Sequence, residues 1–339
     1  MSRPTVNGKA SGRLVKRVAI TILAVLLAGA GWIVYRINDH PSVEPYRSLF
    51  LAPAGEPAGH LRVTFMGVST LLLTDGGVSL LIDGFFSRPG KLPTLFGKVE
   101  PDPDLIVRSL ERAEISRLAA VIVVHSHYDH VMDAPEVAKR TAARLVGSES
   151  TANVGRGAYL QAHRMIVVGD DETLNLGRYR VRLIKTSHFP HGQAMGEIVK
   201  PLVPPARATD YLEGGSYSVL VEHGERSLLI QASAGFVEGA LDEVRADVVF
   251  LGLAGLGTRD DAYRDAYWRE VVDAVEARRV IPIHWDDFTL PLDKPLRPLP
   301  ALLDDFGASM EFVLERAKQR GIDVKMLPTW QSVDPFEGL

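Results

Sequence analysis

The first strong feature of the chain is an apolar stretch near its start. Residues 18–35 are apolar except for Thr21, and as a helix they would span about 27 Å, close to the thickness of a bilayer core. Residues 1–17 carry five basic side chains and no acidic one, whereas Trp32 and Tyr35 lie at the far end of the stretch. This pattern predicts a basic cytoplasmic N-terminus, a transmembrane helix at 18–35, and a membrane-anchored domain outside the cytoplasm, periplasmic or extracellular.

A second interpretation of the same stretch is a cleaved secretory signal. Ala28-Gly29-Ala30 resembles a signal-peptidase site, and cleavage there would release the protein. The apolar run continues through residues 32–35, which favours a retained signal anchor. Pro and Gly recur over residues 36–59, and this composition predicts a tether that leads to a folded domain of residues 60–339.

The rest of the chain alternates between short apolar runs, turn residues and amphipathic stretches. Residues 61–66, 68–74 and 78–82 predict three consecutive strands, the last two joined by a turn at 75–77. Further strands are expected at 118–124, 144–146, 165–168, 179–186, 217–222, 227–232, 248–253, 280–283 and 323–327, and helices at 104–116, 134–143, 150–161, 261–277 and 302–319. Two runs of strands followed by helices predict an α+β domain of stacked sheets with helices outside.

A long loop over residues 85–103 combines prolines and glycines with apolar side chains. Loops of this length are usually functional or mobile. Phe85, Phe86, Leu92, Leu95 and Phe96 predict either packing over a site or contact with an apolar substrate, and both interpretations are open.

Composition limits the chemistry that this chain can perform. The formal net charge of -4 gives no basic surface that would indicate nucleic-acid binding. The chain contains no cysteine, which excludes disulfides, a thiolate nucleophile and cysteine-ligated metals. A metal site must therefore be built from His, Asp and Glu. Nothing in the pattern predicts the oligomeric state.

The most informative segment is His125-Ser126-His127-Tyr128-Asp129-His130, which follows the apolar run 118–124. Imidazoles and carboxylates are the ligands that bind zinc and similar divalent ions. His125 and His127 are two residues apart, so in extended chain both side chains project to one side and can bind one ion. Asp129 and His130, beyond the bend, can reach a second ion. The segment therefore predicts a metal site.

This segment resembles the hallmark motif H-x-H-x-D-H of the metallo-β-lactamase superfamily of metal-dependent hydrolases. The resemblance extends over residues 61–327 and implies a four-layer αββα sandwich with the site between the sheets at one edge. Segments 67–72, 80–83 and 282–285 look most like the branch that holds the ascorbate-6-phosphate lactonase and the N-acyl-phosphatidylethanolamine phospholipase D. The resemblance implies two groups of ligands, His125, His127 and His188 for one ion, and Asp129, His130 and His284 for the other.

One position departs from the family pattern. Members usually carry an aspartate that bridges the two ions, and the matching turn here places Ser233 at that position. A neutral hydroxyl supplies no negative charge to offset two dications. Three arrangements are open: two ions joined by a water-derived bridge alone, a single ion, or a carboxylate supplied by Asp286 or Asp287. Asp83, which ends a predicted strand, is expected either in a turn or as a hydrogen-bond partner of a metal ligand.

The predicted function is hydrolysis by a water activated on one or two ions, Zn²⁺ or another divalent metal. We expect an ester, a lactone or a phosphodiester as the bond, in a small-molecule or lipid-like substrate. Asp129 is expected to orient the water, and His191 is a further candidate for stabilising the developing charge. The alternative, motivated by Ser233, is a degenerate member of the fold that acts as a binding or scaffold module.

Overall fold

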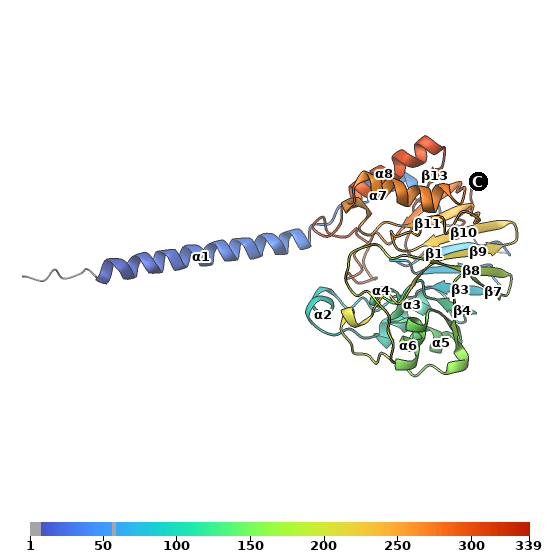
Figure 1. Ribbon diagram of the computed structural model, residues 1–339, viewed down its shortest axis with the longest axis horizontal. Coiled ribbons are helices and arrows are strands. Elements are labelled where there is room, and N and C mark those ends of the chain that lie inside the picture. The colour runs from blue at the N-terminus through green and yellow to red at the C-terminus, as the bar shows by residue number, and fades with distance from the viewer. Residues whose placement is uncertain (1–7, 56–58) are drawn as a thin grey trace, which may run out of the picture.

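The computed structural model describes residues 8–55 and 59–339, so residues 1–7 of the basic N-terminal segment predicted above lie outside the described residues. It begins with one long helix, α1 (Gly8–Ile37), which extends away from a folded domain (Figure 1). Residues Leu14–Ile37 of this helix are long and apolar enough to cross a membrane, and none of that stretch is buried. A signal sequence near an N-terminus shares these properties, so the helix is either a membrane anchor or a signal sequence.

The domain consists of two seven-stranded sheets that lie between two layers of helices (Figure 1). The first sheet has the order β14-β1-β2-β3-β4-β5-β6. Its strands are β1 (Arg62–Phe65), β2 (Leu71–Thr74), β3 (Ser79–Ile82), β4 (Ala120–Ile122), β5 (Arg144–Gly147), β6 (Met165–Val167) and β14 (Ser332–Val333). The second sheet has the order β13-β12-β11-β10-β9-β8-β7. Its strands are β7 (Glu172–Leu176), β8 (Tyr179–Thr186), β9 (Ser216–His223), β10 (Arg226–Gln231), β11 (Val248–Gly252), β12 (Arg279–Ile283) and β13 (Asp323–Val324).

The helices form the two outer layers and several short segments around one end of the sheets. The first sheet is covered by α3 (Pro103–Arg112), α5 (Ala134–Thr141) and α6 (Glu149–Gly157), and the second by α7 (Asp261–Trp268) and α8 (Phe306–Arg320). The shorter helices are α2 (Lys91–Phe96) and α4 (Tyr128–Val131), the 3-10 segments η1 (Glu44–Leu49), η2 (Ala162–Arg164), η3 (Ala208–Asp210) and η4 (Leu256–Thr258), and the π-helical η5 (Arg269–Asp273). The predicted α+β sandwich is therefore confirmed.

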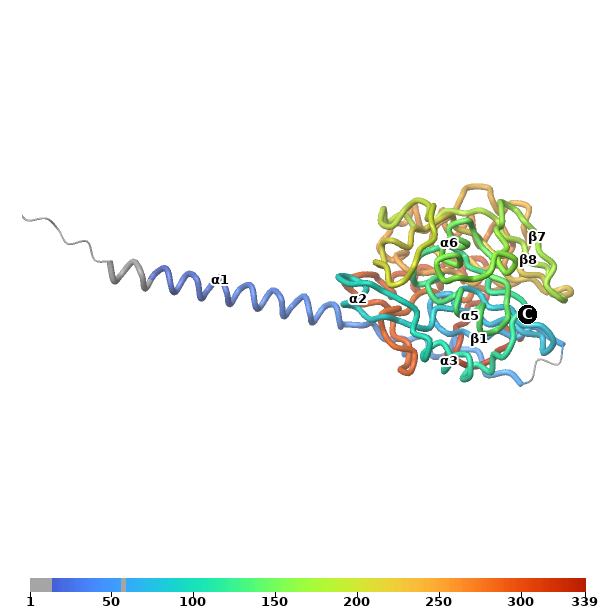
Figure 2. The backbone as a smooth tube through the Cα atoms, turned by 90° about the horizontal axis from the view of Figure 1, so that it is seen from below, coloured from blue at the N-terminus to red at the C-terminus, as the bar shows by residue number. Residues whose placement is uncertain are grey.

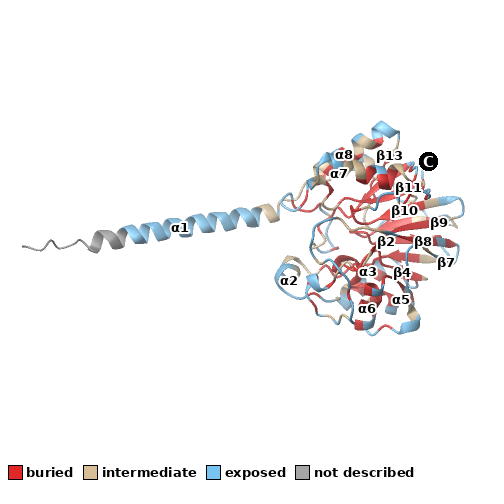
Figure 3. Ribbon diagram, in the orientation of Figure 1, coloured by how far each residue is buried: buried red, intermediate tan, exposed pale blue. Residues whose placement is uncertain are grey.

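Burial explains why the central apolar runs form strands. Every residue of β4, β11 and β12 is buried, as expected for parallel strands covered on both faces. One hydrophobic cluster fills the space between the sheets and continues beneath α7 and α8, and a second lies between the first sheet and α3 and α5. Figure 3 shows the buried residues concentrated in the two sheets. This rigid double sheet fixes the positions of the strand ends.

The segment after α1, which we expected to be a tether, is packed on the domain along residues 38–54. The backbone N–H of Leu51 donates to the carbonyl of Met326 at 2.9 Å, and the N–H of Met326 donates to the carbonyl of Leu49 at 2.8 Å. Tyr46 contacts Phe306 edge to face, with ring centroids 5.5 Å apart. Apolar side chains between the prolines thus hold this segment against the domain, because burying them is favourable.

Candidate metal centre

The six proposed ligands come from the ends of three strands. His125, His127, Asp129 and His130 follow β4, and the last two lie in the first turn of α4. His188 follows β8 and His284 follows β12. β8 and β10 are each antiparallel to β9, and β11 and β12 run parallel to β10. The C-terminal ends of β8, β10 and β12 therefore lie at the same edge of the second sheet. The fold therefore brings distant segments together at one edge.

These residues form two groups of three with the geometry of metal sites. One ligand atom each from His125, His127 and His188 lies within 4.8 Å of the others, and the same holds for one atom each from Asp129, His130 and His284. These are the same two groups that the family resemblance implies. All six side chains are buried except that of His188, which is half-buried.

Hydrogen bonds fix the direction of the lone pairs in the first group. The Nε2 atom of His127 donates to the carbonyl of Ala194 at 3.2 Å, and Nδ1 of His188 donates to the carbonyl of Phe189 at 2.8 Å. A carbonyl only accepts, so the proton of each neutral imidazole is on the bonded nitrogen. The other ring nitrogen of each histidine keeps its lone pair. Nε2 of His125 is buried and has no hydrogen-bond partner among the described residues.

The second group is organised in the same way by Asp83. Oδ2 of Asp83 accepts from Nδ1 of His130 at 2.8 Å and from the hydroxyl of Ser69, and Oδ1 accepts from the N–H of Val124 at 2.9 Å. This places the lone pair of His130 on Nε2, which lies 3.2 Å from Nε2 of His284. Oδ2 of Asp129 lies 3.6 Å from the first of these nitrogens and 3.5 Å from the second. Two nitrogens and a carboxylate oxygen thus converge, as a cation requires.

The protonation states of the first group suit metal binding at neutral pH. Burial lowers the pKa of His125 well below its ordinary value, that of His127 to about 4 and that of His188 to about 2, so all three imidazoles are neutral. In the second group, burial alone would raise the pKa of Asp129, but His130 and His284 outweigh it and lower that pKa. Burial lowers the pKa of His130, but Asp83 and Asp129 outweigh burial and raise it, so metal binding there competes with a proton. Neutral imidazoles and an ionised carboxylate are the forms that bind metal. The residues present therefore fit a pair of divalent ions.

Asp83 is expected to control metal affinity through His130. Replacing Asp83 by Asn keeps the shape but turns one of the two oxygens, which together accept from three donors, into an amide N–H₂ donor. We expect the Asp83→Asn variant to lose about 10- to 100-fold in metal affinity, because partners of this kind orient the ligand and raise its basicity. Competition with a chromophoric chelator measures the affinity. Asp293→Asn, at an exposed position, is the control, and equal affinity of the two variants would contradict this role.

Ser233 lies in the cavity beside the two groups but is not a charged bridge. Its hydroxyl accepts a hydrogen bond from the N–H of Phe189 at 2.9 Å, and so holds the segment that carries His188. The side chain of Gln231 donates to the carbonyls of Ser233 and Gly235 at 3.0 and 2.7 Å. The strand end at which the family resemblance implied a bridging carboxylate is therefore a neutral hydrogen-bonded turn.

The two carboxylates after His284 are engaged elsewhere. Asp286 accepts from the N–H of Val68 at 2.7 Å and from the guanidinium of Arg88 at 2.8 Å. Asp287 accepts from Thr289 and from Nε2 of His40, the latter at 2.9 Å. Both bond networks occupy the carboxylate oxygens. Neither residue therefore supplies the missing bridge, and that interpretation of the sequence is replaced by a structural role for both.

The two groups lie at a cavity of about 550 Å³. His191 lines it, with its ring centroid 4.8 Å from that of His188, and its Nδ1 accepts from the N–H of Gln193 at 3.0 Å. The proton of neutral His191 is therefore on Nε2, which is left as a donor. Sequence reasoning missed most of the apolar lining, because those residues come from segments scattered between positions 95 and 303. It includes Leu95, Tyr128, Phe189, Ala208, Ala254, Phe288, Leu299 and Leu303.

Comparison with known proteins identifies the family. A profile of the Metallo-beta-lactamase superfamily matches residues 63–282, which is well over half of the chain. The chain belongs to the metallo-beta-lactamase superfamily. Within this superfamily, the chain is similar to a UPF0173 metal-dependent hydrolase of Methanopyrus kandleri, with 25% identity over 258 residues, 75% of this chain and 96% of the relative. A protein of the same description from Heliobacterium modesticaldum is 25% identical over 239 residues, 67% of this chain and 84% of the relative.

Solved structures agree on the superfamily fold. Igni18, described as a novel metallo hydrolase from the hyperthermophilic archaeon Ignicoccus hospitalis, has a TM-score of 0.51 and 15% sequence identity to this chain. The match covers 80% of this chain and 97% of Igni18. At that identity the likeness establishes the metallo-beta-lactamase fold and nothing about the substrate.

Proposed function

We propose that this protein is a metal-dependent hydrolase that cleaves an ester, lactone or phosphodiester bond of a small-molecule or lipid-like substrate. The observation that carries the proposal is the convergence of two ligand groups, with lone pairs directed inward by their hydrogen bonds, at one cavity. The relatives described as metal-dependent hydrolases support the reaction class. The superfamily's hydrolytic members and a cysteine-free chain favour metal over thiolate chemistry.

We assign the first ion to His125, His127 and His188 and the second to Asp129, His130 and His284. Zn²⁺ suits this ligand set of imidazoles and a carboxylate. An ion held there would lower the pKa of water from 15.7 to about 7 and would polarise the scissile carbonyl or phosphoryl group. Asp129 would accept a hydrogen bond from the attacking water and so orient it. Nε2–H of His191 is positioned to donate a hydrogen bond to the oxygen on which negative charge develops.

The apolar lining of the cavity serves substrate binding. The cavity combines the polar ligand groups with apolar side chains, among them Leu95, Phe189, Phe288 and Leu303. A substrate with a polar reactive group and an apolar body would match both parts of this lining. We further propose that α1 is retained as an anchor with the domain outside the cytoplasm. Trp32 and Tyr35 near its C-terminal end and Lys16 and Arg17 near its N-terminal end support this orientation.

Metal analysis of the full chain together with a small substrate panel tests the proposed function. We expect one or two zinc ions per chain after reconstitution in detergent, and hydrolysis of a p-nitrophenyl ester, a lactone or bis(p-nitrophenyl) phosphate. Activity should disappear with a chelator and return with zinc, because metal binding supplies the reactive water. A content below about 0.2 ion per chain would instead favour a binding or scaffold module, since a functional site of this type is metal-loaded.

A further inference from the structure

Helix α2 presents apolar side chains that nothing in the described chain covers. Leu92, Leu95 and Phe96 are 72%, 63% and 84% exposed. The helix lies on the side of the domain where α1 joins it, and both Figure 1 and Figure 2 show this placement. Exposed apolar groups of this size usually mark a surface that binds another apolar phase.

A second apolar element lies at the same junction. Leu302 and Leu303 are 43% and 58% exposed, and the N–H of the preceding Ala301 donates to the carbonyl of Asp39 at 3.1 Å. Nζ of Lys91, the first residue of α2, donates to the carbonyl of Ile37 at 2.7 Å. The first apolar element is therefore bonded to the last residue of α1, and the second to the chain two residues beyond it.

His40 fixes this junction to the metal-bearing edge of the sheet. Its Nε2 bonds to Oδ2 of Asp287 at 2.9 Å, and both side chains are buried. Asp287 is three residues beyond His284, a proposed ligand. The end of α1, the two apolar elements and the site are thus parts of one rigid arrangement, so a membrane around α1 has a defined position relative to the cavity.

Both apolar elements contribute to the lining of the cavity. Leu95 of α2 and Leu303 line it together with four of the six proposed ligands. At the end of α1, Trp32 and Tyr35 are exposed, and the guanidinium of Arg36 lies 5.6 Å from the ring of Trp32. Aromatic and basic residues at a helix end occupy the headgroup region of a bilayer. The two apolar elements bonded next to this helix end are therefore held close to that level.

We propose that α2 and Leu302–Leu303 form a docking surface for the bilayer that holds α1, and that the substrate enters the cavity from this bilayer. We assign a lipid bilayer as the partner of this docking surface, because Leu14–Ile37 of the adjoining α1 is long and apolar enough to cross a membrane. The inference rests on the proposed function and narrows its substrate to an amphiphile. Its polar bond reaches the metal groups while its apolar part passes between Leu95 and Leu303.

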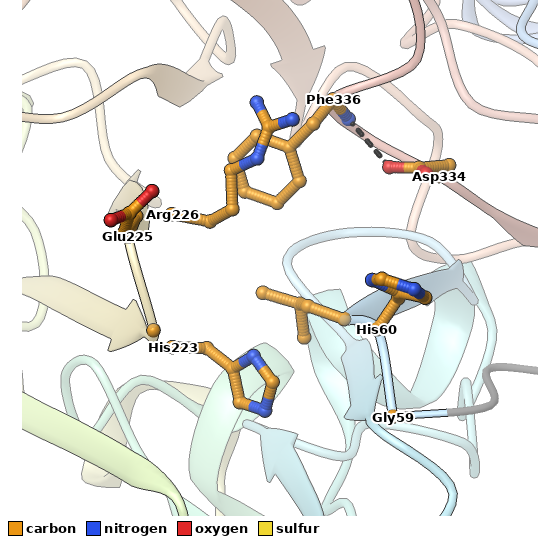
Figure 4. Close-up of a pocket in the computed structure, with 9 residues that line it drawn as sticks. Gly59, His60, His223, Glu225, Arg226, Asp334 and Phe336 are labelled. Carbon is orange, nitrogen blue, oxygen red and sulfur yellow. Dashed lines mark hydrogen bonds between the residues drawn. The ribbon is translucent and has the colours of Figure 1, made fainter.

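Depth measurements on the full chain test the docking surface without any assay of activity. Because the chain has no cysteine, Phe96→Cys and Leu302→Cys each create a single labelling site for an environment-sensitive fluorophore. Glu225→Cys is the control. It lies in the turn between β9 and β10, at the end of these strands remote from Ser233, beside a separate pocket shown in Figure 4.

In vesicles of phosphatidylethanolamine and phosphatidylglycerol, we expect blue-shifted emission and quenching by spin-labelled lipids at positions 96 and 302 but not at 225. Equal behaviour at all three positions would overturn the docking surface. Release of the chain from the vesicles by cleavage near residue 30 would overturn it as well. Neither result depends on whether the protein hydrolyses a substrate.

A matched pair of substrates tests entry from the membrane. We combine Leu92→Asp, Phe96→Asp and Leu302→Asp, which do not line the cavity, and compare the variant with Tyr159→Asp, an exposed position after α6. Hydrolysis of a long-chain substrate embedded in vesicles should fall about tenfold, because charged side chains oppose insertion, while hydrolysis of its soluble short-chain analogue is unchanged. Equal rates on the vesicle substrate would overturn the inference. Absence of hydrolysis of both substrates by the unaltered chain would overturn the proposed hydrolase but leave the depth result standing.

Discussion

The His127→Ala variant should lose at least about 1,000-fold in kcat/KM, because a metal contributes several kcal/mol of transition-state stabilisation and each 1.36 kcal/mol changes a rate tenfold. His127 shares its group with His125 and His188, and its Nε2 is fixed by the carbonyl of Ala194. Without this imidazole, two ligands remain for the first ion. We therefore expect the metal content to fall by about one ion per chain, as measured by mass spectrometry on the purified full chain.

His163→Ala is the matched control for this variant. His163 lies in η2 and is exposed, so its removal should leave both metal content and kcat/KM unchanged. A His127→Ala variant that retains full activity would show that the first group is not part of the catalytic site. Loss of activity with unchanged metal content would show that His127 acts on the substrate instead of on the ion.

The ligand positions were predictable because strand ends can be read from apolar runs. Residues 179–186 alternate between apolar and polar side chains, and residues 280–283 are an apolar run, so both segments predict strands. His188 lies two residues beyond the first strand, and His284 follows the second directly. Strands that run in the same direction end at one edge of a sheet, so these side chains meet there. The four ligands in the six-residue segment after β4 could be predicted from the local sequence alone.

The partners of the ligands were harder to predict, because they depend on which strands pair. β3 and β4 are parallel neighbours, with Ile82 opposite Ile122. Asp83, the residue after β3, therefore lies beside the start of the segment that carries His130 and bonds to its Nδ1. Sequence reasoning offered a turn or a ligand partner and had no means to choose. The carbonyls of Ala194 and Phe189 carry no side-chain signal at all.

Some elements of the fold were missed for similar reasons. β7 is an edge strand in which exposed and partly buried residues alternate without a strong apolar face, and β14 contains two residues. The segment 38–54 has the composition of a linker, yet Tyr46 and Leu51 pack on the domain. In each case the decisive contact is with residues far away in the sequence, which local propensity does not encode.

Asp286→Ala should destabilise the domain by about 3–5 kcal/mol, since removing one partner of a buried ion pair leaves the other charge buried and unpaired. The side chains of Arg88 and Asp286 are both fully buried, with Nη1 and Oδ2 2.8 Å apart. Nε and Nη2 of Arg88 have no hydrogen-bond partner among the described residues, so Nη1 makes the bonds that compensate for burial. The N–H of Val68 also loses its acceptor, Oδ1 of Asp286.

Urea unfolding of the full chain in detergent, followed by tryptophan fluorescence, measures this loss. Asp293→Ala serves as the control, because Asp293 pairs with Lys294 at 4.0 Å where both side chains are largely exposed, and its removal should change stability by no more than about 0.5 kcal/mol. Adding Arg88→Met to Asp286→Ala should recover most of the lost stability, because the double variant buries no unpaired charge. If the double variant is as unstable as the single one, the loss arises from the Val68 contact and the ion pair is not what holds the segment after His284 in place.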